Sequence, residues 1–361
     1  MRREPDVHPL WQPQPARIAV FRALQLGDML CAVPALRALR RRFPRARITL
    51  IGLAGAEGFQ QRFNAYVDEL APFPGMAGLP EQPPDADALP GFFSWARAQR
   101  FDVALQLHGS GRLTHDIVRR LGAARMAGFR PQAPAETEPH AWWMPWPDHL
   151  PEVERYLELM RFLDIACDDA ALEFPVTGTD REAAAALSMR EGLRPDRTVL
   201  VHPGARLPSR RWPAERYAAV ASAIARAGYD VALTGSGQER PLAREVARLA
   251  RAPLHDLAGR TELGVLAALL ERSRLLVCND TGVSHMAAAM RTPSVVIASG
   301  SDTHRWAPAD RTRHVVLWHD VACRPCAHPE CPIGHPCALG VEVPDVVRQA
   351  ERMLCKEPSH A

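Results

Sequence analysis

The sequence LLVCNDTGVSHMAAAMRT, residues 275–292, decides how this chain folds. It opens with four apolar residues, a run short enough for a buried strand, and continues into an apolar pattern with helical spacing. The junction between the two consists of Asn279, Asp280, Thr281 and Gly282. The chain is therefore predicted to turn from strand to helix at this junction.

This turn has the features of an anion-binding site. The first N–H groups of a helix have no acceptor within the helix, and small residues let a ligand approach the backbone. Thr281 and Ser284 add hydroxyl groups, and His285, one turn into the helix, adds a donor or a positive charge. The alternative is an ordinary helix in which Asp280 or Thr281 serves only as the N-cap.

Length and composition indicate a globular protein of two domains. A chain of 361 residues is too long for one core of ordinary size. Hydrophobic residues make up 47% of it and charged residues 24%, which is the composition of folded proteins. The net charge of +3 is too small to suggest a nucleic-acid partner. Lys356 is the only lysine, so nearly all cationic side chains are arginines, which suit phosphate and carboxylate groups.

Neither a targeting segment nor a membrane span is expected. Residues 1–15 are charged and proline-rich, lack the apolar region of a signal peptide, and are predicted to form a flexible leader. The longest apolar runs, such as residues 294–298, are far shorter than the ~20 residues that a bilayer helix needs. We therefore expect a cytoplasmic protein whose eight cysteines are mostly reduced or metal-bound.

The first half of the chain alternates between strand and helix patterns. A helix is expected at residues 29–42, and strands are expected at 17–21, 48–53, 67–70, 103–107 and 125–129. Such alternation predicts a parallel sheet covered by helices on both faces. An irregular stretch follows at residues 131–151 and contains three tryptophans. They could line an acceptor groove or touch a membrane, but packing against their own domain is the interpretation we favour.

The second half restarts the same alternation after a predicted linker at residues 176–195. Strands are expected at 199–201, 230–233, 254–257, 275–278, 294–298 and 314–317. The predicted fold class is α/β, with two Rossmann-like, doubly wound domains at residues 16–175 and 196–340 that face each other across a cleft. Residues 341–361 are expected to form a helix that packs back on the first domain. Ligands of such sheets bind at the carboxyl ends of the strands.

The first strand is followed by Gly27 and Asp28. Gly27 permits a tight turn, and Asp28 lies at the entrance of the next helix. A carboxylate that faces a cleft can accept a proton. The alternative is that Asp28 is simply a helix N-cap.

Polar motifs follow several strands of the second domain. HPGA at residues 202–205 precedes SRRWP at 209–213, and TGSGQE at 234–239 is glycine-rich, with Glu239 placed to meet a sugar or ribose hydroxyl. With the junction at 279–282, these loops predict one site for a nucleotide diphosphate. The predicted donor-binding residues are His202, Gly204, Arg210, Arg211, Gly237, Glu239, Asp280, Thr281, Gly282, Ser284 and His285.

In this order and at these spacings, the motifs resemble those of the bacterial heptosyltransferases, glycosyltransferase family nine. The resemblance covers residues 17–347 and includes LGD at 26–28, PALRALRRRFP at 34–44 and a closing CRPC…CPIGHPC. It implies a GT-B architecture, with the acceptor held mainly by the first domain and the donor nucleotide by the second. Asp28 matches the general base of the family, and Asp280, Thr281, Gly282 and His285 match its diphosphate-contacting segment.

The family transfers heptose from ADP-heptose to the inner core of lipopolysaccharide. The resemblance thus implies an inverting glycosyltransferase acting on a lipid-linked or core oligosaccharide, with peripheral contact at the inner face of the inner membrane as an option. No divalent cofactor is required, because positive groups already face the leaving diphosphate. Arg210 stands where the family usually has lysine, and Ala32 or Val33 where it often has threonine, so the sugar and the acceptor stay open. Transfer of another nucleotide-activated sugar, a sugar-nucleotide epimerase and a non-catalytic nucleotide-sugar binder are the alternatives.

Four cysteines near the end of the chain have the spacing C-x2-C-x4-C-x5-C in a loop at residues 323–337. Such a run can supply four tetrahedral ligands to a structural zinc ion. The competing interpretation, which we favour, is a reduced and packed cysteine loop. The residues concerned are Cys323, Cys326, Cys331 and Cys337.

Overall fold

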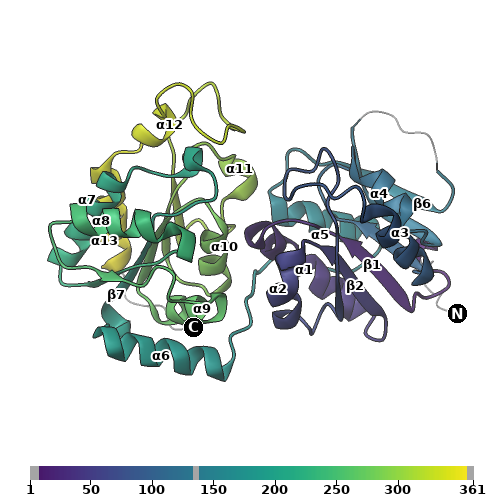
Figure 1. Cartoon of the computed structure of the whole chain (residues 1–361), viewed down its shortest axis with the longest axis horizontal. Helices are drawn as coiled ribbons and strands as arrows, with labels where there is room; N and C mark the ends of the chain where they lie inside the picture. The colour runs from purple at the N-terminus through teal and green to yellow at the C-terminus, as the bar shows by residue number, and fades with distance from the viewer. Residues whose placement is uncertain (1–7, 133–137, 356–361) are drawn as a thin grey trace, which may run out of the picture. The chain divides into compact units, whose positions relative to one another are not determined.

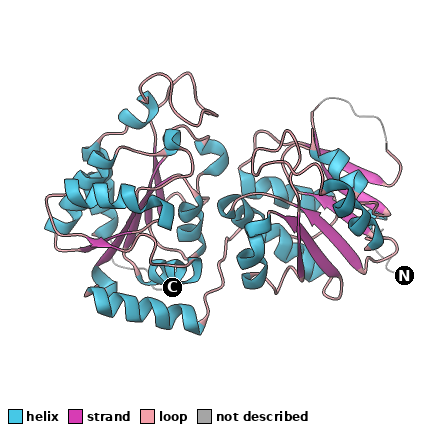
Figure 2. Ribbon diagram, viewed as in Figure 1, coloured by secondary structure: helices cyan, strands magenta, loops and turns pink. Residues whose placement is uncertain are grey.

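Short apolar runs form the strands of two parallel sheets, one in each half of the chain. The computed structural model describes residues 8–132 and 138–355. The chain divides into two units, Met1–Ala171 and Leu172–Ala361. In both units helices cover the faces of the sheet (Figures 1 and 2), which confirms the predicted doubly wound α/β fold class.

The first sheet has the strand order β3-β2-β1-β4-β5-β6, and all neighbouring pairs are parallel. The chain winds from β1 towards β3 and then returns to β4 on the other side of β1. The winding direction therefore reverses between β1 and β4, which is where such sheets bind ligands. The strands are β1 (Arg17–Phe21), β2 (Arg47–Gly52), β3 (Glu69–Pro72), β4 (Val103–Gln106), β5 (Arg125–Arg130) and β6 (Ala141–Pro145).

Helix α1 (Leu26–Arg42) follows β1 and begins earlier than the predicted helix at residues 29–42. Pro34 lies inside this helix. Apolar side chains on both faces of β1 are buried, and Phe21, Phe73 and Phe93 belong to one core cluster. The other helices of this unit are α2 (Glu57–Arg62), α3 (Leu89–Ala98), α4 (Thr114–Arg120) and α5 (Glu152–Phe162), with short 3₁₀ turns η1 (Pro9–Trp11) and η2 (Ala54–Ala56).

The prediction of a flexible leader at residues 1–15 is wrong for residues 8–15, which the structure describes. Residues 1–7 lie outside the described residues, but Leu10 and Trp11 are buried. The indole N–H of Trp11 donates to the carbonyl of Leu163 at 2.6 Å, and its ring lies 4.7 Å from that of Phe43. Burial of this large ring outweighs the local charge and proline content from which the leader was predicted.

The tryptophan-rich stretch at residues 131–151 contains a strand that its sequence did not reveal. Its tryptophans and prolines show no clear alternation, yet β6 pairs in parallel with β5 at the edge of the sheet, where proline is tolerated. Trp146 is buried against Phe129, with ring centroids 4.8 Å apart, and under the guanidinium of Arg155. For Trp146 the favoured interpretation, packing within its own domain, is confirmed.

The second sheet has the order β12-β11-β10-β7-β8-β9, again with all pairs parallel. Read from β9, it repeats the strand order of the first sheet, and its winding direction reverses between β7 and β10. The strands are β7 (Thr198–His202), β8 (Asp230–Leu233), β9 (His255–Asp256), β10 (Leu275–Asn279), β11 (Ser294–Ile297) and β12 (His314–Leu317).

Helices of the second unit connect these strands. None of the helices in the part of the chain that the structure describes is long and apolar enough to cross a bilayer. They are α6 (Gly178–Glu191), α7 (Ala214–Arg226), α8 (Arg240–Leu249), α9 (Leu263–Arg272), α10 (Gly282–Ala289), α11 (Thr303–Trp306), α12 (Pro336–Leu339) and α13 (Val343–Leu354), with 3₁₀ turns η3 (Pro195–Arg197), η4 (Pro208–Arg210) and η5 (Gly237–Glu239).

Two segments predicted to lie between or outside the domains belong to the second unit. Most of the predicted linker at residues 176–195 is α6, whose Arg181 forms an ion pair with Glu271 of α9 at 2.8 Å. The terminal helix α13 lies beside α7 (Figure 1), and its Val346 and Ala350 are fully buried in the core of the second unit. The prediction that residues 341–361 pack back on the first domain is therefore wrong, and residues 356–361 lie outside the described residues.

Candidate functional site

The polar motifs of the second unit lie at the carboxyl ends of three neighbouring strands. His202 ends β7, the TGSGQE loop follows β8, and Asn279 ends β10. In the sheet, β7 lies between β10 and β8. The structure therefore brings the three predicted loops together at one edge of the sheet, at the reversal of its winding direction.

The buried amide of Asn279 binds the HPGA loop and the SRRWP segment to the end of β10. Its side chain is fully buried, and its Oδ1 accepts a hydrogen bond from the backbone N–H of Trp212 at 2.9 Å. Its Nδ2 donates to the carbonyls of Pro203 at 2.7 Å and Gly204 at 3.2 Å. Sequence reasoning assigned no role to this side chain, although an asparagine at the end of a buried apolar strand was a signal, because asparagine is disfavoured in strands.

Glu239 lies against the HPGA loop. A Cβ atom on Gly204 would lie only 2.0 Å from a carboxylate oxygen of Glu239, so glycine is needed for this close approach. Oε2 of Glu239 accepts the backbone N–H of Ser236 at 2.7 Å and lies 3.9 Å from Nε2 of His202. Nδ1 of His202 is 3.1 Å from the hydroxyl of Thr234.

The environment of this pair sets the charge on each group. Burial lowers the pKa of His202, against the opposing charge of Glu239. Burial works to raise the pKa of Glu239, but the charge of His202 and the hydrogen bonds from Ser236 outweigh it and hold that pKa below its ordinary value. Glu239 is therefore held as a carboxylate beside the buried imidazole of His202. Such a carboxylate can accept hydrogen bonds from the hydroxyls of a ribose or a sugar.

The two adjacent arginines of the SRRWP motif point to different partners. Nε of Arg211 donates to the carbonyl of Ala205 at 2.8 Å, and its charge acts on Glu239. Arg210 instead donates from Nη2 to the carbonyl of Cys326 at 2.5 Å. Burial lowers the pKa of Arg210, and the negative charge of Asp280 opposes this effect. Arg211 thus belongs with the HPGA loop, whereas Arg210 belongs with Asp280 and the cysteine loop.

At the start of α10, the N-cap position is occupied by Thr281, but its side chain makes no capping hydrogen bond. The alternative, in which Asp280 or Thr281 serves only as the N-cap, therefore agrees with the position of Thr281 but not with that of Asp280. Ser284 is fully buried and its hydroxyl donates to the carbonyl of Thr281 at 2.7 Å, which favours a role in shaping the first turn over ligand contact. His285 is largely buried, with its ring edge-on to Trp306 at 6.3 Å.

The cysteine loop, residues 323–337, packs on these motifs. The backbone N–H and hydroxyl of Ser209 donate to the carbonyls of Pro329 at 3.0 Å and His328 at 2.5 Å, and Nε2 of His335 lies 2.9 Å from the carbonyl of Ser209. The N–H of Cys326 donates to the carbonyl of Gly300 at 2.8 Å, beyond the end of β11. The loop therefore forms part of the wall around Arg210.

The four cysteines of this loop are free thiols in the structure. Cys337 is buried, whereas Cys323 is exposed. Within residues 8–132 and 138–355, no group of three or more histidine, cysteine, aspartate or glutamate side chains is arranged to hold a metal ion. As they stand, the side chains do not form the tetrahedral set that zinc requires.

In the first unit, Asp28 is the third residue of α1 and lies beyond the carboxyl end of β1. The N-cap of this helix is Gln25, so the alternative that Asp28 is the N-cap is wrong. A carboxylate in the first turn is stabilised by the positive end of the helix dipole. Asp28 is partly buried and lies where the winding direction of the first sheet reverses.

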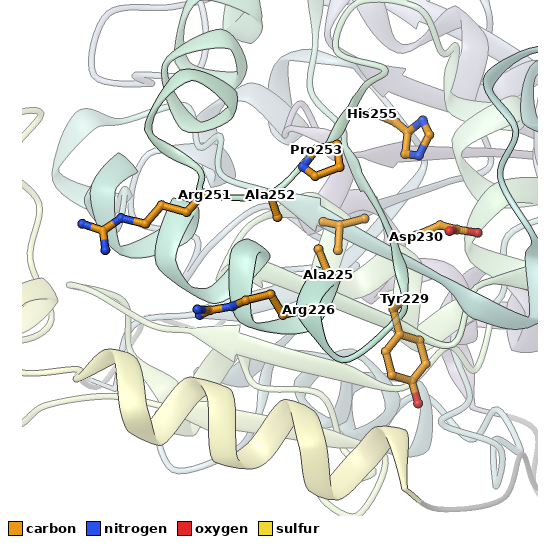
Figure 3. Close-up of a pocket in the computed structure, with 9 residues that line it drawn as sticks. Ala225, Arg226, Tyr229, Asp230, Arg251, Ala252, Pro253 and His255 are labelled. Carbon is orange, nitrogen blue, oxygen red and sulfur yellow. The ribbon is translucent and has the colours of Figure 1, made fainter.

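A surface pocket of about 350 Å³ lies at the opposite end of the second sheet (Figure 3). Asp230 begins β8 and His255 begins β9, so the pocket opens at the amino ends of the strands. In Figure 3 the side chains of Arg226 and Arg251 extend in the same direction, away from Asp230 and His255. Ligands of parallel sheets bind at the carboxyl ends, so we assign this pocket no part in the site.

Two doubly wound units, with polar loops gathered at the carboxyl ends of the strands in the second and Asp28 beyond β1 in the first, define the class of two-domain α/β proteins with GT-B architecture. More narrowly, the chain belongs to glycosyltransferase family 9 (heptosyltransferase), whose model matches residues 94–336. This family is the one that the sequence motifs indicated.

Several lipooligosaccharide and lipopolysaccharide heptosyltransferases are similar in sequence to parts of this chain. Lipooligosaccharide heptosyltransferase 2 of Haemophilus influenzae is 35% identical over 100 residues, which cover 26% of this chain and 29% of that protein. Lipopolysaccharide heptosyltransferase 2 of Escherichia coli is 31% identical over 119 residues, covering 32% and 34%. Lipooligosaccharide heptosyltransferase 2 of Campylobacter jejuni is 26% identical over 169 residues, covering 45% and 53%. The matched regions thus span about a third to a half of the length of these relatives.

Solved structures share the fold over nearly the whole chain. The glycosyl transferase family 9 structure from Veillonella parvula has a TM-score of 0.77 at 21% identity and covers 95% of this chain and 98% of that one. E. coli ADP-heptose lps heptosyltransferase II has a TM-score of 0.69 at 20% identity and covers 94% and 98%. These similarities concern the fold.

Proposed function

We propose that this protein is an inverting glycosyltransferase that moves heptose from ADP-heptose to a hydroxyl of a lipopolysaccharide-core or related glycan. The observation that carries the proposal is the gathering of polar loops at the carboxyl ends of β10, β7 and β8, where the buried amide of Asn279 binds the HPGA and SRRWP segments and Glu239 of the loop after β8 lies against Gly204. The relatives are lipopolysaccharide and lipooligosaccharide heptosyltransferases, which supports the choice of sugar and acceptor.

In this proposal the second unit binds the donor. The first N–H groups of α10, together with Arg210, Arg211 and His285, stabilise the negative charge of the leaving diphosphate. Glu239, held as a carboxylate beside Gly204, accepts hydrogen bonds from hydroxyls of the nucleotide ribose or the sugar. Cationic groups thus face the leaving group, and the reaction as proposed needs no divalent ion.

Asp28 acts as the general base in this proposal. Inversion requires that the acceptor hydroxyl lose its proton as it attacks the anomeric carbon from the side opposite the diphosphate. A carboxylate at the first turn of α1, stabilised as an anion by the helix dipole, can take that proton. The acceptor is a lipid-linked or core oligosaccharide, and the protein acts in the cytoplasm at the inner face of the inner membrane.

The test combines donor binding with turnover. Purified protein is incubated with a panel of nucleotide sugars, and the melting temperature and the released nucleotide diphosphate are measured with and without a lipopolysaccharide-core acceptor. Stabilisation by ADP-heptose and ADP release that depends on the acceptor are expected. If another nucleotide sugar stabilises the protein instead, the sugar of that nucleotide, and not heptose, is the one transferred. A change in the nucleotide sugar without any acceptor would indicate an epimerase instead, and binding without turnover a non-catalytic protein.

For the donor site, we expect Arg210→Ala and His285→Ala each to weaken binding of the nucleotide diphosphate about tenfold, because each removes a donor to a largely buried anion worth ~1 to 3 kcal/mol. Arg210→Lys should have the mildest effect, since lysine keeps the charge. Isothermal titration with ADP measures these affinities. Affinities equal to that of the wild type in both alanine variants would show that the diphosphate binds elsewhere.

For the cysteine loop, we propose the reduced and packed state, with a structural zinc ion as the alternative. Elemental analysis of protein prepared in metal-free buffer is expected to find no stoichiometric metal. Zinc at about one ion per chain would contradict this expectation, and Cys323→Ser and Cys331→Ser variants that lose the metal would then identify this loop as its site.

A further inference from the structure

Where the winding direction of the first sheet reverses, a buried guanidinium connects both strands to the helix that carries Asp28. Arg22 directly follows β1 and is fully buried. Its Nη1 donates to the carbonyl of Leu107, which follows β4, at 2.5 Å. Its Nη2 donates to the backbone carbonyl of Asp28 in the first turn of α1. One side chain therefore bridges β4 and α1 from the end of β1.

Burying a guanidinium costs free energy unless its charge and its donors are satisfied. Arg22 lies over the ring of Tyr156, with Cζ 4.4 Å from the ring centroid, and the Tyr156 hydroxyl donates to Glu152. The carboxylate of Glu152 also accepts a hydrogen bond from Arg155 at 3.1 Å. The carboxylate of Glu152 is thus bound by Arg155 and Tyr156, and its charge also acts on Arg22. Among the described residues, Nε of Arg22 has no hydrogen-bond partner.

The second negative charge near Arg22 is that of Asp28. Burial opposes the charged form of Arg22, but the influence of Tyr156, Glu152 and Asp28 outweighs it and raises the pKa of Arg22. The attraction is mutual, so the guanidinium that holds the backbone of Asp28 also favours an ionised carboxylate on the same residue. The charge of the buried Arg22 is therefore compensated by Asp28 as well as by Glu152 of α5.

The loop between β1 and α1 is also held from β4. The backbone N–H of Ala23 donates to Nδ1 of His108 at 3.3 Å, and the His108 ring stacks on Phe21 with centroids 5.4 Å apart. This contact fixes the start of the loop, whereas the hydrogen bond from Arg22 fixes its end at Asp28. Removing Arg22 would therefore free the end that carries the carboxylate.

We propose that Arg22 is a positioning residue for Asp28, setting the place of the first turn of α1 relative to the end of the sheet. The inference rests on the proposed function, in which Asp28 is the general base. Arg22 has no contact with a reactant in this role and acts only through Asp28. Because displacing a catalytic group by about 1 Å can lower a rate up to ~100-fold, its loss should reduce turnover rather than donor binding.

The test compares Arg22→Met, which keeps the length but removes the charge and the donors, with Arg22→Lys, which keeps the charge but lacks the planar fork. We expect kcat to fall about tenfold in Arg22→Met and less in Arg22→Lys, with the donor KM within about twofold of the wild-type value. Amide hydrogen exchange of residues 23–30 should be faster in Arg22→Met. The fold should survive, because Glu152 keeps Arg155 and Tyr156 as partners.

Arg37→Met is the matched control. Arg37 is a largely buried arginine of the same helix, and it donates to the carbonyls of Asp169 at 2.9 Å and Ala171 at 3.2 Å. Its variant should lose stability but keep the wild-type kcat and the wild-type exchange of residues 23–30. This pattern separates a positioning role from the general cost of removing a buried arginine.

Wild-type kcat in a folded Arg22→Met variant overturns the proposal, as does unchanged exchange of residues 23–30. If Arg22→Met does not fold, the proposal is decided by Arg22→Lys, whose kcat must then lie below that of the wild type. If the wild-type protein transfers no sugar at all, the proposed function fails, and the exchange of residues 23–30 still decides whether Arg22 holds the segment around Asp28.

Discussion

Replacing Asp28 with asparagine is expected to lower the rate of sugar transfer by ~100-fold or more while donor binding survives. Asparagine keeps the size and the hydrogen-bonding reach of the side chain but cannot take a proton from the acceptor. Asp28 is the third residue of α1, where its charge interacts favourably with the helix dipole and with the buried Arg22, so the variant should lose at least about 0.3 to 1 kcal/mol of stability. Transfer rate, donor affinity and melting temperature are measured on one preparation.

Asp116→Asn is the matched control for this variant. Asp116 is the third residue of α4, an exposed aspartate in the first turn of another helix of the same unit. Its replacement should remove only the interaction with the helix dipole, about 0.3 to 1 kcal/mol of stability, and cause no loss of transfer. Nearly normal transfer by Asp28→Asn would remove Asp28 from the mechanism, and the base would then have to be another group.

The second large effect is expected at Asn279, where leucine should raise the Kd for the nucleotide diphosphate by about 100-fold. Leucine is similar in size but leaves the N–H of Trp212 and the carbonyls of Pro203 and Gly204 without their buried partner. Each unsatisfied group costs ~1 to 3 kcal/mol, so the HPGA loop and the segment that carries Arg211 should move away from the end of β10, and the free energy of unfolding should fall by several kcal/mol. Titration with ADP and chemical denaturation measure the two effects.

Thr292→Val controls for the loss of a buried hydrogen bond elsewhere in the same unit. Thr292 precedes β11, at the amino end of the sheet, and its hydroxyl donates to the carbonyl of Leu270 at 2.7 Å. Its replacement should cost ~1 to 2 kcal/mol of stability and leave the affinity for ADP unchanged. A folded Asn279→Leu variant with wild-type affinity would show that the HPGA and SRRWP segments do not need this amide to form the donor site.

By itself, the sequence determined the order and type of most elements. The predicted strands at 17–21, 230–233 and 314–317 coincide with β1, β8 and β12. Such strands can be predicted because a short apolar run bounded by charged or turn residues is a local feature of the sequence. The motifs also identified the family, since their order and spacing are linear properties. Asp28 and the loops at 202–205, 234–239 and 279–282 could be found in this way as residues that follow strands.

Only the tertiary structure decided which partners these residues have. The roles of Asn279 and Arg22 depend on backbone carbonyls that are far away in the sequence, at Gly204 and Leu107. Arg210 differs from Arg211 for the same reason, because its partner is the distant carbonyl of Cys326. The helix expected within residues 341–361 forms as α13, but the sequence did not reveal that the core of the second unit buries it. Local periodicity predicts that a side chain is buried. Which group then serves as the hydrogen-bond partner of a buried polar side chain depends on the packing of segments that are distant in the sequence.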